Sequence, residues 1–365
     1  MNLPDYDRLR EQTPFGWRLV STYLALLDLT GIAIRDLFLL PEAGIELYRR
    51  GRPRLREVYG DLPVVLPGVC TAPVSYGHVN TLGAELVFPE GGEVNLETLC
   101  PTLEDGLRVV RQERDFSRCG MFPFYLDYHR QMVKAFPGEP VGFAFKAEGP
   151  LTTAYALRRD GFFYDFYDQP EKTEEFLGRL VDSAVEYGRC VRQVVRNDFS
   201  AALPAAGSVA DDLAAMLNPG LWGRFVVPFH ERWFKAVCTG RRSCHIENLT
   251  ARHLPYLEQL GVVGFDPSVS PNLTPAQIAS HCRVPFSWHL FNFHVMVMTE
   301  AQVRQWVLAA VGAGASQVVC HVCHGMGTPA MVGKVAAFAD ACREVDTMFA
   351  ANATRNDIAR LAPGG

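Results

Sequence analysis

The sequence has 365 residues, 48% hydrophobic and 21% charged, which is typical of a globular protein with enough apolar material for a core. A formal net charge of -5 and a pI near 6.1 give no electrostatic reason to expect a polyanionic partner, and the basic run at residues 49–54 is interrupted, so nucleic-acid binding is not expected. No stretch approaches the roughly 18 apolar residues that span a bilayer, and the charged N-terminus does not resemble a secretion signal. We therefore expect a cytoplasmic protein with no membrane partner, whose ten cysteines are mostly buried thiols.

The first 60 residues are expected to be mainly helical, with an apolar stretch at residues 19–29. A buried strand is predicted at residues 63–70, and a hairpin at residues 84–94, closed by Gly91 and Gly92. Residues 171–196 carry apolar side chains at helix-face spacing and predict a long amphipathic helix. Further helices are expected at residues 219–239 and 250–260. Three later helices carry start signals, and these are Thr274 before Pro275, Thr299 with Gln302, and Thr328 before Pro329.

Strands and helices alternate through most of the chain with short connections, which indicates parallel strands joined by crossover helices. Seven strands are predicted, and an eighth is expected within the first 60 residues; the seven lie at 63–70, 141–147, 200–206, 243–247, 262–266, 284–289 and 317–322. We predict an α/β protein with a single (β/α)8 TIM barrel over residues 1–365, on which residues 1–60 form a helical N-terminal extension. A doubly wound open sheet is the alternative, but the Gly-rich phosphate turn expected after its first strand is missing.

Polar and reactive side chains gather where the predicted strands end. On a barrel all of these face one mouth, although a lone polar residue at a strand end is more often a cap or a loop hydrogen-bonder. The set comprises Glu148, Asp211, Asp212, His245, Glu247, Asp266, His289, His321, Cys323 and His324. Trp288 belongs to an aromatic-rich stretch that either lines a pocket for a flat substrate or is part of the core.

Three of these residues predict a metal site. His245 and Glu247 are two apart and project to the same side of a strand, and Cys323 follows the last strand. Imidazole, carboxylate and thiolate are all zinc donors, and three protein ligands leave a fourth position open for chemistry. The alternative is that His245 and Glu247 form hydrogen bonds while Cys323 is simply buried. Three neighbouring residues, Cys320, His321 and His324, compete as ligands. In a regular strand His321 points to the same side as Cys323, and Cys320 faces away.

Other chemistries have weaker signatures. There is no G-x-S-x-G and no Walker loop, so the usual hydrolase and nucleotide-binding motifs are absent. Cys320 and Cys323 have the C-x-x-C form of a redox pair. They end a strand instead of starting a helix, so the helix dipole that lowers a thiol pKa is not evident.

Several segments in order resemble the uroporphyrinogen decarboxylase superfamily over nearly the whole chain. They are residues 31–41, 82–89, 149–152, 211–219 and 225–229, then His245-x-Glu247 before a helix, and Cys323 in the last strand-loop. The resemblance implies a single (β/α)8 barrel. The Arg-rich N-terminal segment with which true decarboxylases grip their substrate is missing, which argues against porphyrinogen decarboxylation.

The other large branch of the superfamily, the cobamide-dependent methyltransferases, binds zinc through H-x-C in one strand and a Cys in the last. His245 and Cys323 match two of these positions, and Glu247 replaces the first Cys; a carboxylate is a harder donor, so iron or another divalent metal is an alternative to zinc. The resemblance implies methyl transfer from a methylcobamide, with a corrinoid protein as a possible partner, to a thiol or similar small acceptor. His289, His321, His324 and Asp212 would then be catalytic, and Glu148, Asp211, Asp266, Trp288 and Asn292 would bind substrate.

Two alternatives stay open at this point. The first is metal-assisted decarboxylation or lyase chemistry on a small organic acid, with a histidine as proton donor. The second is a non-catalytic barrel that only binds a metal or a corrinoid. The methyl donor, the acceptor and the oligomeric state are not specified by the sequence.

Overall fold

A computed structural model describes residues 3–362, and its contacts divide the chain into two compact units. One unit comprises the chain up to Ile32, Glu46–Pro67, and the chain from Glu247 onward; the other comprises Ala33–Ile45 and Gly68–Ile246. We call them the outer-sequence unit and the middle-sequence unit. The prediction of a single domain stays a prediction.

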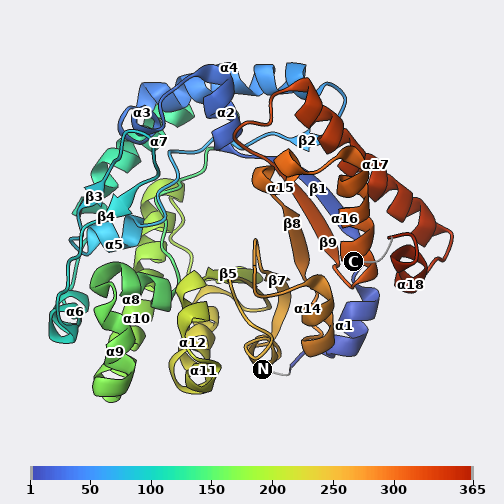
Figure 1. The fold of residues 1–365 in the computed structure, drawn as a ribbon. Helices are drawn as coiled ribbons and strands as arrows, with labels where there is room; N and C mark the ends of the chain where they lie inside the picture. Colours follow the sequence, from blue (N-terminus) through green and yellow to red (C-terminus); the bar gives the residue numbers. More distant parts are fainter. Residues whose placement is uncertain (1–2, 363–365) are drawn as a thin grey trace. The chain divides into compact units, whose positions relative to one another are not determined.

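The outer-sequence unit contains a parallel sheet in the order β2-β1-β9-β8. β1 lies between β2 and β9, with Leu19 opposite both Val64 and Cys320, and β7 joins β8 through a parallel bridge between Phe265 and Phe286. Figure 1 shows α16 and α17 beside β8 and β9. The elements are α1 Tyr6–Gln12, β1 Gly16–Ser21, α2 Tyr23–Thr30, most of α4 Pro41–Tyr59, β2 Val64–Val65, α13 Pro255–Gln259, β7 Val262–Asp266, α14 Pro275–His281, β8 Ser287–Leu290, α15 Asn292–Val297, α16 Glu300–Gly312, β9 Gln317–Val322, α17 Pro329–Ala350 and α18 Arg355–Ala359.

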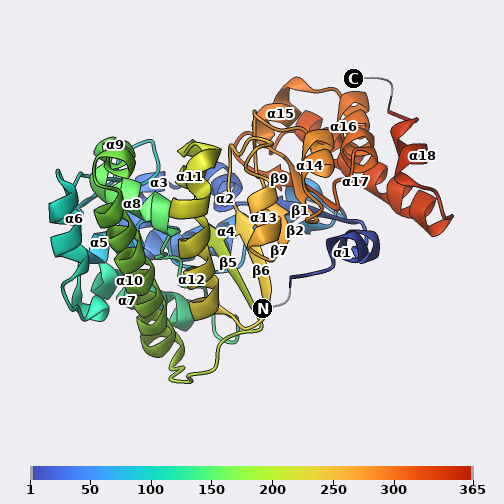
Figure 2. The ribbon, with the colours of Figure 1, turned by 90° about the horizontal axis from the view of Figure 1, so that it is seen from below.

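The middle-sequence unit is mostly helical, with one parallel strand pair, β5 and β6, in which Ala210 lies opposite His245. Residues 70–74 and 142–145 run parallel but meet only through isolated bridges at Cys70–Gly142 and Val74–Phe145. In Figure 2, α10 and α12 lie side by side along this unit. The elements are α3 Ile34–Leu39, α5 Gly77–Thr81, β3 Leu86–Val87, β4 Asn95–Leu96, α6 Leu103–Val110, the 3-10 turn η1 Phe116–Arg118, α7 Phe122–Ala135, α8 Pro150–Arg158, α9 Gly161–Asp168, α10 Pro170–Arg196, β5 Ala206–Ala210, the 3-10 turn η2 Asp212–Met216, α11 Pro219–Phe225, α12 Val227–Val237 and β6 Arg241–His245.

Helix α10 shows why the sequence folds as it does locally. Its apolar stripe, which includes Phe176, Leu177, Leu180 and Val181, is buried against α6, α8 and α12. Each fully buried side chain of this kind stabilises the folded state by about 1.5–3 kcal/mol. The helix ends at Asn197, whose positive φ of 51° gives the left-handed residue that commonly terminates helices.

Several predicted elements are confirmed. Strands 262–266 and 317–322 have the predicted bounds, the hairpin forms between β3 and β4, and the caps at Thr274, Thr299 and Thr328 all accept backbone hydrogen bonds. The eighth strand is β1, so the first 60 residues are not wholly helical. All ten cysteines are free thiols.

Other bounds differ from the prediction. The strand predicted at 200–206 forms at Ala206–Ala210, that at 243–247 at Arg241–His245, and that at 284–289 at Ser287–Leu290. The helix predicted at 219–239 breaks into α11 and α12 at Val226, two residues before Pro228, which lacks the N–H needed to continue an α-helix. Glu247 therefore lies in a turn after β6, so the alternation that would align it with His245 does not apply.

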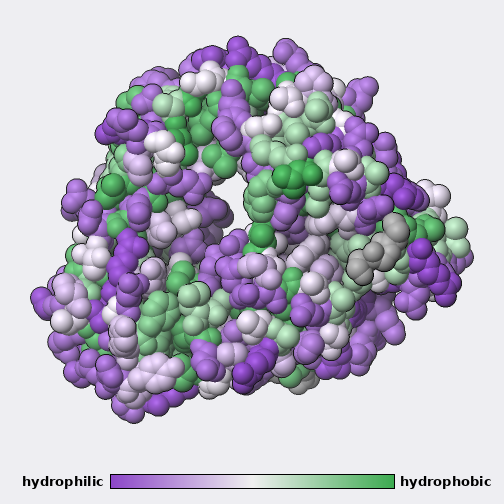
Figure 3. All heavy atoms as spheres, viewed as in Figure 1, coloured by the Kyte–Doolittle hydropathy of each residue, from purple (hydrophilic) through white to green (hydrophobic). Residues whose placement is uncertain are grey.

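The surface is largely polar on the face shown in Figure 3, where purple, hydrophilic residues predominate. Within residues 3–362, no helix has the length and apolar character needed to cross a membrane.

Candidate functional site

Three predicted site residues form a connected chain at the ends of β7, β8 and β9. Asp266 ends β7, His289 lies in β8 and His321 in β9. His289 Nε2 lies 3.2 Å from Asp266 Oδ1 and 2.9 Å from Ser287 Oγ, and His289 Nδ1 lies 3.0 Å from His321 Nε2. We call these three residues the Asp-His-His relay. The structure thus brings together Asp266, predicted to bind substrate, and two histidines predicted to be catalytic.

The contacts of the relay are consistent with one assignment of the ring protons. If His289 donates its Nε2–H to Asp266, its Nδ1 is an acceptor, and His321 must donate Nε2–H to it. His321 Nδ1 then keeps its lone pair, and it forms no hydrogen bond with any described residue. Burial, reinforced by the neighbouring His289, lowers the pKa of His321 to about 4, so the ring is neutral at pH 7.

An aromatic side chain fixes the orientation of His321. The Phe291 ring stacks on it with centroids 4.1 Å apart and planes 6° apart, and Phe293 stacks on Phe291 at 6.0 Å. Trp288 neighbours His289 in β8 and is half-buried. The relay therefore has a flat apolar wall on one side of its terminal ring.

The loop after β9 is held by the helices around it. His324 Nδ1 is in ion-pair contact with Asp28 of α2, whose other carboxylate oxygen accepts a 2.5 Å hydrogen bond from the Gly325 N–H. Asn292 Nδ2 donates to the His324 carbonyl at 3.0 Å, so this predicted substrate-binding residue supports the loop. Tyr59 donates its hydroxyl to the Met326 carbonyl at 2.7 Å. The His324 side chain remains largely exposed beside the relay strands.

Cys320 and Cys323 lie in different surroundings. Cys320 is fully buried near Cys342 of α17, and burial strongly raises the pKa of its thiol. Burial also raises the pKa of Cys323, an effect that the nearby Thr22 side chain partly opposes. Without a neighbouring cation both thiols are protonated at neutral pH. Of the two, only Cys323 lies at the end of the strand where reactive groups gather.

In the middle-sequence unit, Glu148 occupies an unusual environment. Burial raises the pKa of its carboxyl to about 7, the nearby carboxylates of Asp212 and Asp211 add to this rise, and a hydrogen bond from Ser75 opposes it. Glu148 in turn raises the pKa of the Tyr76 hydroxyl, which burial already raises. A carboxyl with a pKa of about 7 exchanges a proton at physiological pH, which a purely substrate-binding role does not require.

Asp211 has a structural role. It is fully enclosed, and its carboxylate accepts hydrogen bonds from the Leu151 and Thr152 N–H groups at the start of α8, at 3.3 and 2.7 Å, while His230 Nε2 lies 2.7 Å away. Such a carboxylate satisfies free N–H groups and the positive end of the helix dipole. These partners enclose its oxygens in this structure, and the substrate-binding role predicted for Asp211 stays a prediction.

The predicted metal ligands are divided between the two units. His245 ends β6 with Nε2 3.9 Å from Asp212 Oδ1, and both side chains are partly exposed. Glu247 and Cys323 belong to the other unit. Among residues 3–362, no group of three or more His, Cys, Asp or Glu side chains is placed to hold a metal ion. The donor types suit zinc or iron, and the triad itself stays a prediction.

A comparison with known protein families identifies the family of this chain. The uroporphyrinogen decarboxylase (URO-D) family profile matches residues 76–345, which is most of the chain. The chain belongs to the uroporphyrinogen decarboxylase family. Membership in this enzyme family confirms the predicted α/β fold, a (β/α)8 TIM barrel, and explains why the reactive residues follow the carboxyl ends of parallel strands.

A solved structure supports the fold assignment. A methyltransferase from Methanosarcina mazei superposes with a TM-score of 0.64 over 93% of this chain and 96% of its own, at 16% sequence identity. At that identity the likeness concerns the fold. No curated protein matches the chain significantly.

Four contributors to these sites were not predicted from the sequence of this family member. They are Asp28, Tyr59, Ser75 and Tyr76, which lie on helices or loops and carry no local motif. Only the pairing of β1 with β9, which brings α2 to the loop after β9, identifies Asp28. Phe291 belongs to the aromatic-rich segment for which the sequence left open a pocket wall or a place in the core.

Proposed function

We propose that the protein is a methyltransferase that moves a methyl group between a corrinoid and a thiol or similar small acceptor. The Asp-His-His relay carries the proposal, because a thiol that accepts a methyl group must give up its proton. His321 presents a neutral ring with one unoccupied nitrogen, linked through His289 to a carboxylate. The similarity to a methyltransferase over nearly the whole chain supports this choice of chemistry.

The relay residues have distinct tasks in this proposal. His321 Nδ1 accepts the proton of the acceptor, and His289 Nδ1 withdraws the Nε2 proton of His321 as positive charge develops. Asp266 stabilises that charge from the far end, as a carboxylate does for an imidazole in other catalytic triads. The stacked Phe291 ring keeps His321 in the plane needed for this transfer and provides an apolar surface for the acceptor.

The donor chemistry of His245, Glu247 and Cys323 suits a divalent metal, zinc or iron, and a metal of this kind lowers the pKa of a thiol that it binds. In its buried environment the Cys323 thiol is protonated, and a nearby cation would favour the thiolate instead. A methylcobamide as methyl donor, and a corrinoid protein that delivers it, belong to the same proposal.

The test is the loss of methyl groups from methylcobalamin in the presence of a panel of small thiols, followed by absorbance. We expect His321→Gln to lower kcat at least 100-fold with little change in KM, because proton transfer typically contributes about 10²–10⁴-fold. His281→Gln, which alters an exposed histidine on α14, is the matched control and should behave like the wild type. Wild-type protein with no activity towards any thiol in the panel would contradict the proposal.

Metal analysis of the purified protein tests the ligand set separately. We expect stoichiometric zinc or iron in the wild type and its loss in Glu247→Ala, with retention in Glu113→Ala, an exposed carboxylate on a loop. If metal-free wild-type protein still transferred methyl groups, the metal would be excluded from the proposed mechanism, and only the part of the proposal that concerns the relay would remain.

Decarboxylation or lyase chemistry on a small organic acid is the second candidate, and Glu148 favours it. A carboxyl with a pKa of about 7 can deliver a proton to the carbon that loses carbon dioxide. Release of labelled carbon dioxide from small carboxylic acids, abolished in Glu148→Gln, would support this reaction in place of methyl transfer.

A further inference from the structure

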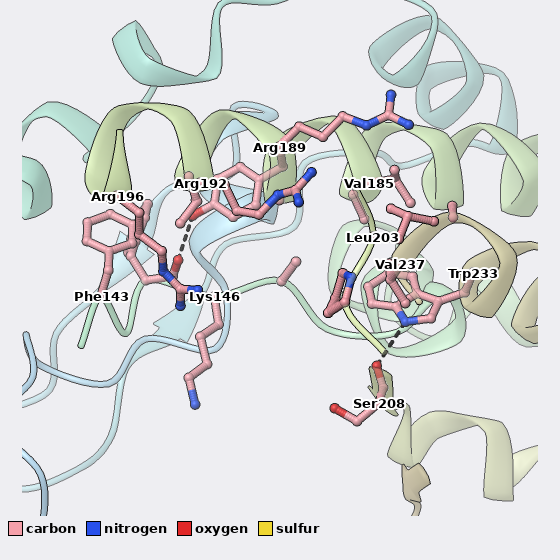
Figure 4. A pocket seen from close by; sticks show the side chains of 18 residues that line it. Phe143, Lys146, Val185, Arg189, Arg192, Arg196, Leu203, Ser208, Trp233 and Val237 are labelled. Carbon is pink, nitrogen blue, oxygen red and sulfur yellow. Dashed lines mark hydrogen bonds between the residues drawn. The ribbon is translucent and has the colours of Figure 1, made fainter. Parts of the chain in front are cut away.

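A cavity of about 500 Å³ lies within the middle-sequence unit, apart from the residues at the strand ends (Figure 4). Its walls come from the last turns of α10, the end of α12, residues 143–147, and the stretch that leads into β5. Leu203 and Pro204 precede β5, and Ala236 and Val237 precede β6, so most of the lining is at the amino ends of these strands. Glu148, Asp212 and His245 follow the carboxyl ends. The volume is in the range that accommodates a small molecule.

The cavity exists because two neighbouring segments diverge. Residues 142–147 and β5 are joined where they end, by a 2.6 Å hydrogen bond from the Gly149 N–H to the Ala210 carbonyl. Nearer the amino ends of these two segments, side chains donate hydrogen bonds to backbone carbonyls that could otherwise have paired one segment with the other. The Tyr187 hydroxyl donates to the Phe145 carbonyl at 2.6 Å, and Trp233 Nε1 donates to the Ser208 carbonyl at 2.9 Å, as Figure 4 shows for Trp233. These two bonds fix both rings and keep the gap from being closed by backbone pairing.

The charge of the lining has one sign. Arg189, Arg192, Arg196 and Lys146 line the cavity, and no Asp or Glu does. The three arginines are spaced three and four residues apart and so lie along one face of α10, where like charges repel each other. Arg192 donates to the Ala202 carbonyl at 3.3 Å, which is a neutral partner, and neither Arg189 nor Arg196 forms an ion pair with any residue in 3–362. An anion would neutralise this repulsion.

The remaining lining is mostly apolar, and its polar side-chain groups are Ser208 and the donors of Tyr187 and Trp233. Phe143, Val185, Leu203 and the rings of Tyr187 and Trp233 contribute apolar surface. Figure 4 shows Arg192 and Arg196 on one wall with Trp233 and Ser208 at the other end. We propose that this cavity binds an amphipathic anion, a small molecule with an apolar body and one carboxylate or phosphate head held by Arg192 and Arg196. The site is separate from the Asp-His-His relay and does not depend on the reaction proposed for it.

The proposal is tested by fluorescence titration of the full-length protein with 8-anilinonaphthalene-1-sulfonate, an amphipathic anion, and with N-phenyl-1-naphthylamine, which has similar rings but no charge. We expect the double variant R192Q/R196Q to weaken binding of the sulfonate at least 10-fold and that of the neutral probe less than 2-fold. R179Q, on the same helix but near Glu175 and outside the cavity, is the control and should change neither. Equal effects of R179Q and R192Q/R196Q on the sulfonate would overturn the proposal.

A second variant tests the cavity without removing charge. A side chain at Gly188 would enter open space, since no atom lies within 4 Å of the position of its Cβ, and Gly188 lines the cavity within α10. Gly188→Leu should therefore fold and exclude both probes. Unchanged sulfonate binding in this variant, with an unchanged circular dichroism spectrum, would place the probe elsewhere and refute the site. Displacement of the sulfonate by decanoate or by decyl phosphate identifies the head group, and displacement by neither contradicts the proposed ligand class.

Discussion

His78 offers a quantitative test of how the middle-sequence unit is built. It is fully buried, with Nε2 2.9 Å from Ser183 Oγ and its ring between Phe116 and Tyr187. Its Nδ1 has no hydrogen-bond partner among the described residues. Burial, assisted by the positive charge of Arg114, lowers the pKa of the ring to about 3 from an ordinary value of 6.5. The ring is therefore neutral in the folded protein at neutral and mildly acidic pH.

The consequence is a pH-dependent stability. Between pH 6.5 and 3 the unfolded chain holds a proton on this ring that the folded chain does not, so the free energy of unfolding falls as the pH drops through that window. From about pH 7.5 to about pH 5, the loss attributable to this one histidine is about 2 kcal/mol. Domains are usually stable by about 5–15 kcal/mol, so the loss is a substantial fraction of the total for a protein at the lower end of this range.

Urea denaturation of the wild type and of His78→Gln at the two pH values isolates the effect. Glutamine does not titrate, so the stability advantage of the wild type over the variant should shrink by about 2 kcal/mol at the lower pH. His281→Gln serves as the control, and its difference from the wild type should be almost independent of pH. A wild-type advantage over His78→Gln that is constant between the two pH values would show that the ring is protonated, or is exposed, in the folded state.

Three further predictions concern neighbouring positions in the same unit. Gly149→Ala should lower the free energy of unfolding by about 2–3 kcal/mol in urea titrations, because its Cβ would lie 2.4 Å from the Cβ of Asp211, whereas Gly223→Ala, with open space around it, should not destabilise. Arg158→Met should cost about 3–5 kcal/mol, since it leaves the buried Asp165 carboxylate without its partner at 2.9 Å; a loss below 1 kcal/mol, on the order of an exposed pair, would refute this. Glu148→Gln should be more stable than the wild type by about 1–3 kcal/mol above pH 7, where the wild-type carboxyl must ionise in a poorly solvated place, and this gain should vanish near pH 4.5; a gain independent of pH would contradict the raised pKa.

The parts of the fold that could be predicted are those with a local physical cause. The caps at Thr274 and Thr299 and the apolar stripe of α10 depend on residues within a few positions of each other, and they formed where predicted. The position of β1 was not predicted, because its apolar residues are followed directly by those of α2. The combined apolar stretch has the pattern of a single helix. The boundary of β6 was misplaced by two residues, which matters because Glu247 then leaves the strand.

The candidate site was predictable in outline and not in its connections. Strand ends identified His289, His321 and Asp266 as members of one group, because parallel strands present their carboxyl ends together. Which ring nitrogen meets which atom depends on strand register and on rotamers, and neither is encoded by spacing along the chain. The role of Asp211 illustrates the converse, since a carboxylate at a strand end turned inward to satisfy a helix terminus.

The loop after β9 has a consequence for how this family member tolerates change. Asp28 holds both His324 and Gly325, Tyr59 holds the Met326 carbonyl, and Gly325 has a positive φ of 76° with the Met296 side chain where its Cβ would be. A segment that hydrogen bonds from two helices already hold in place loses little conformational entropy when it binds a ligand. The affinity of the loop for a ligand then depends partly on Asp28 and Tyr59, which are far from it in the sequence. Under the proposed function, substitutions of Asp28 in α2 or of Tyr59 in α4 should therefore change ligand affinity, and homologues that replace Asp28 are expected to alter the residue at position 324 as well.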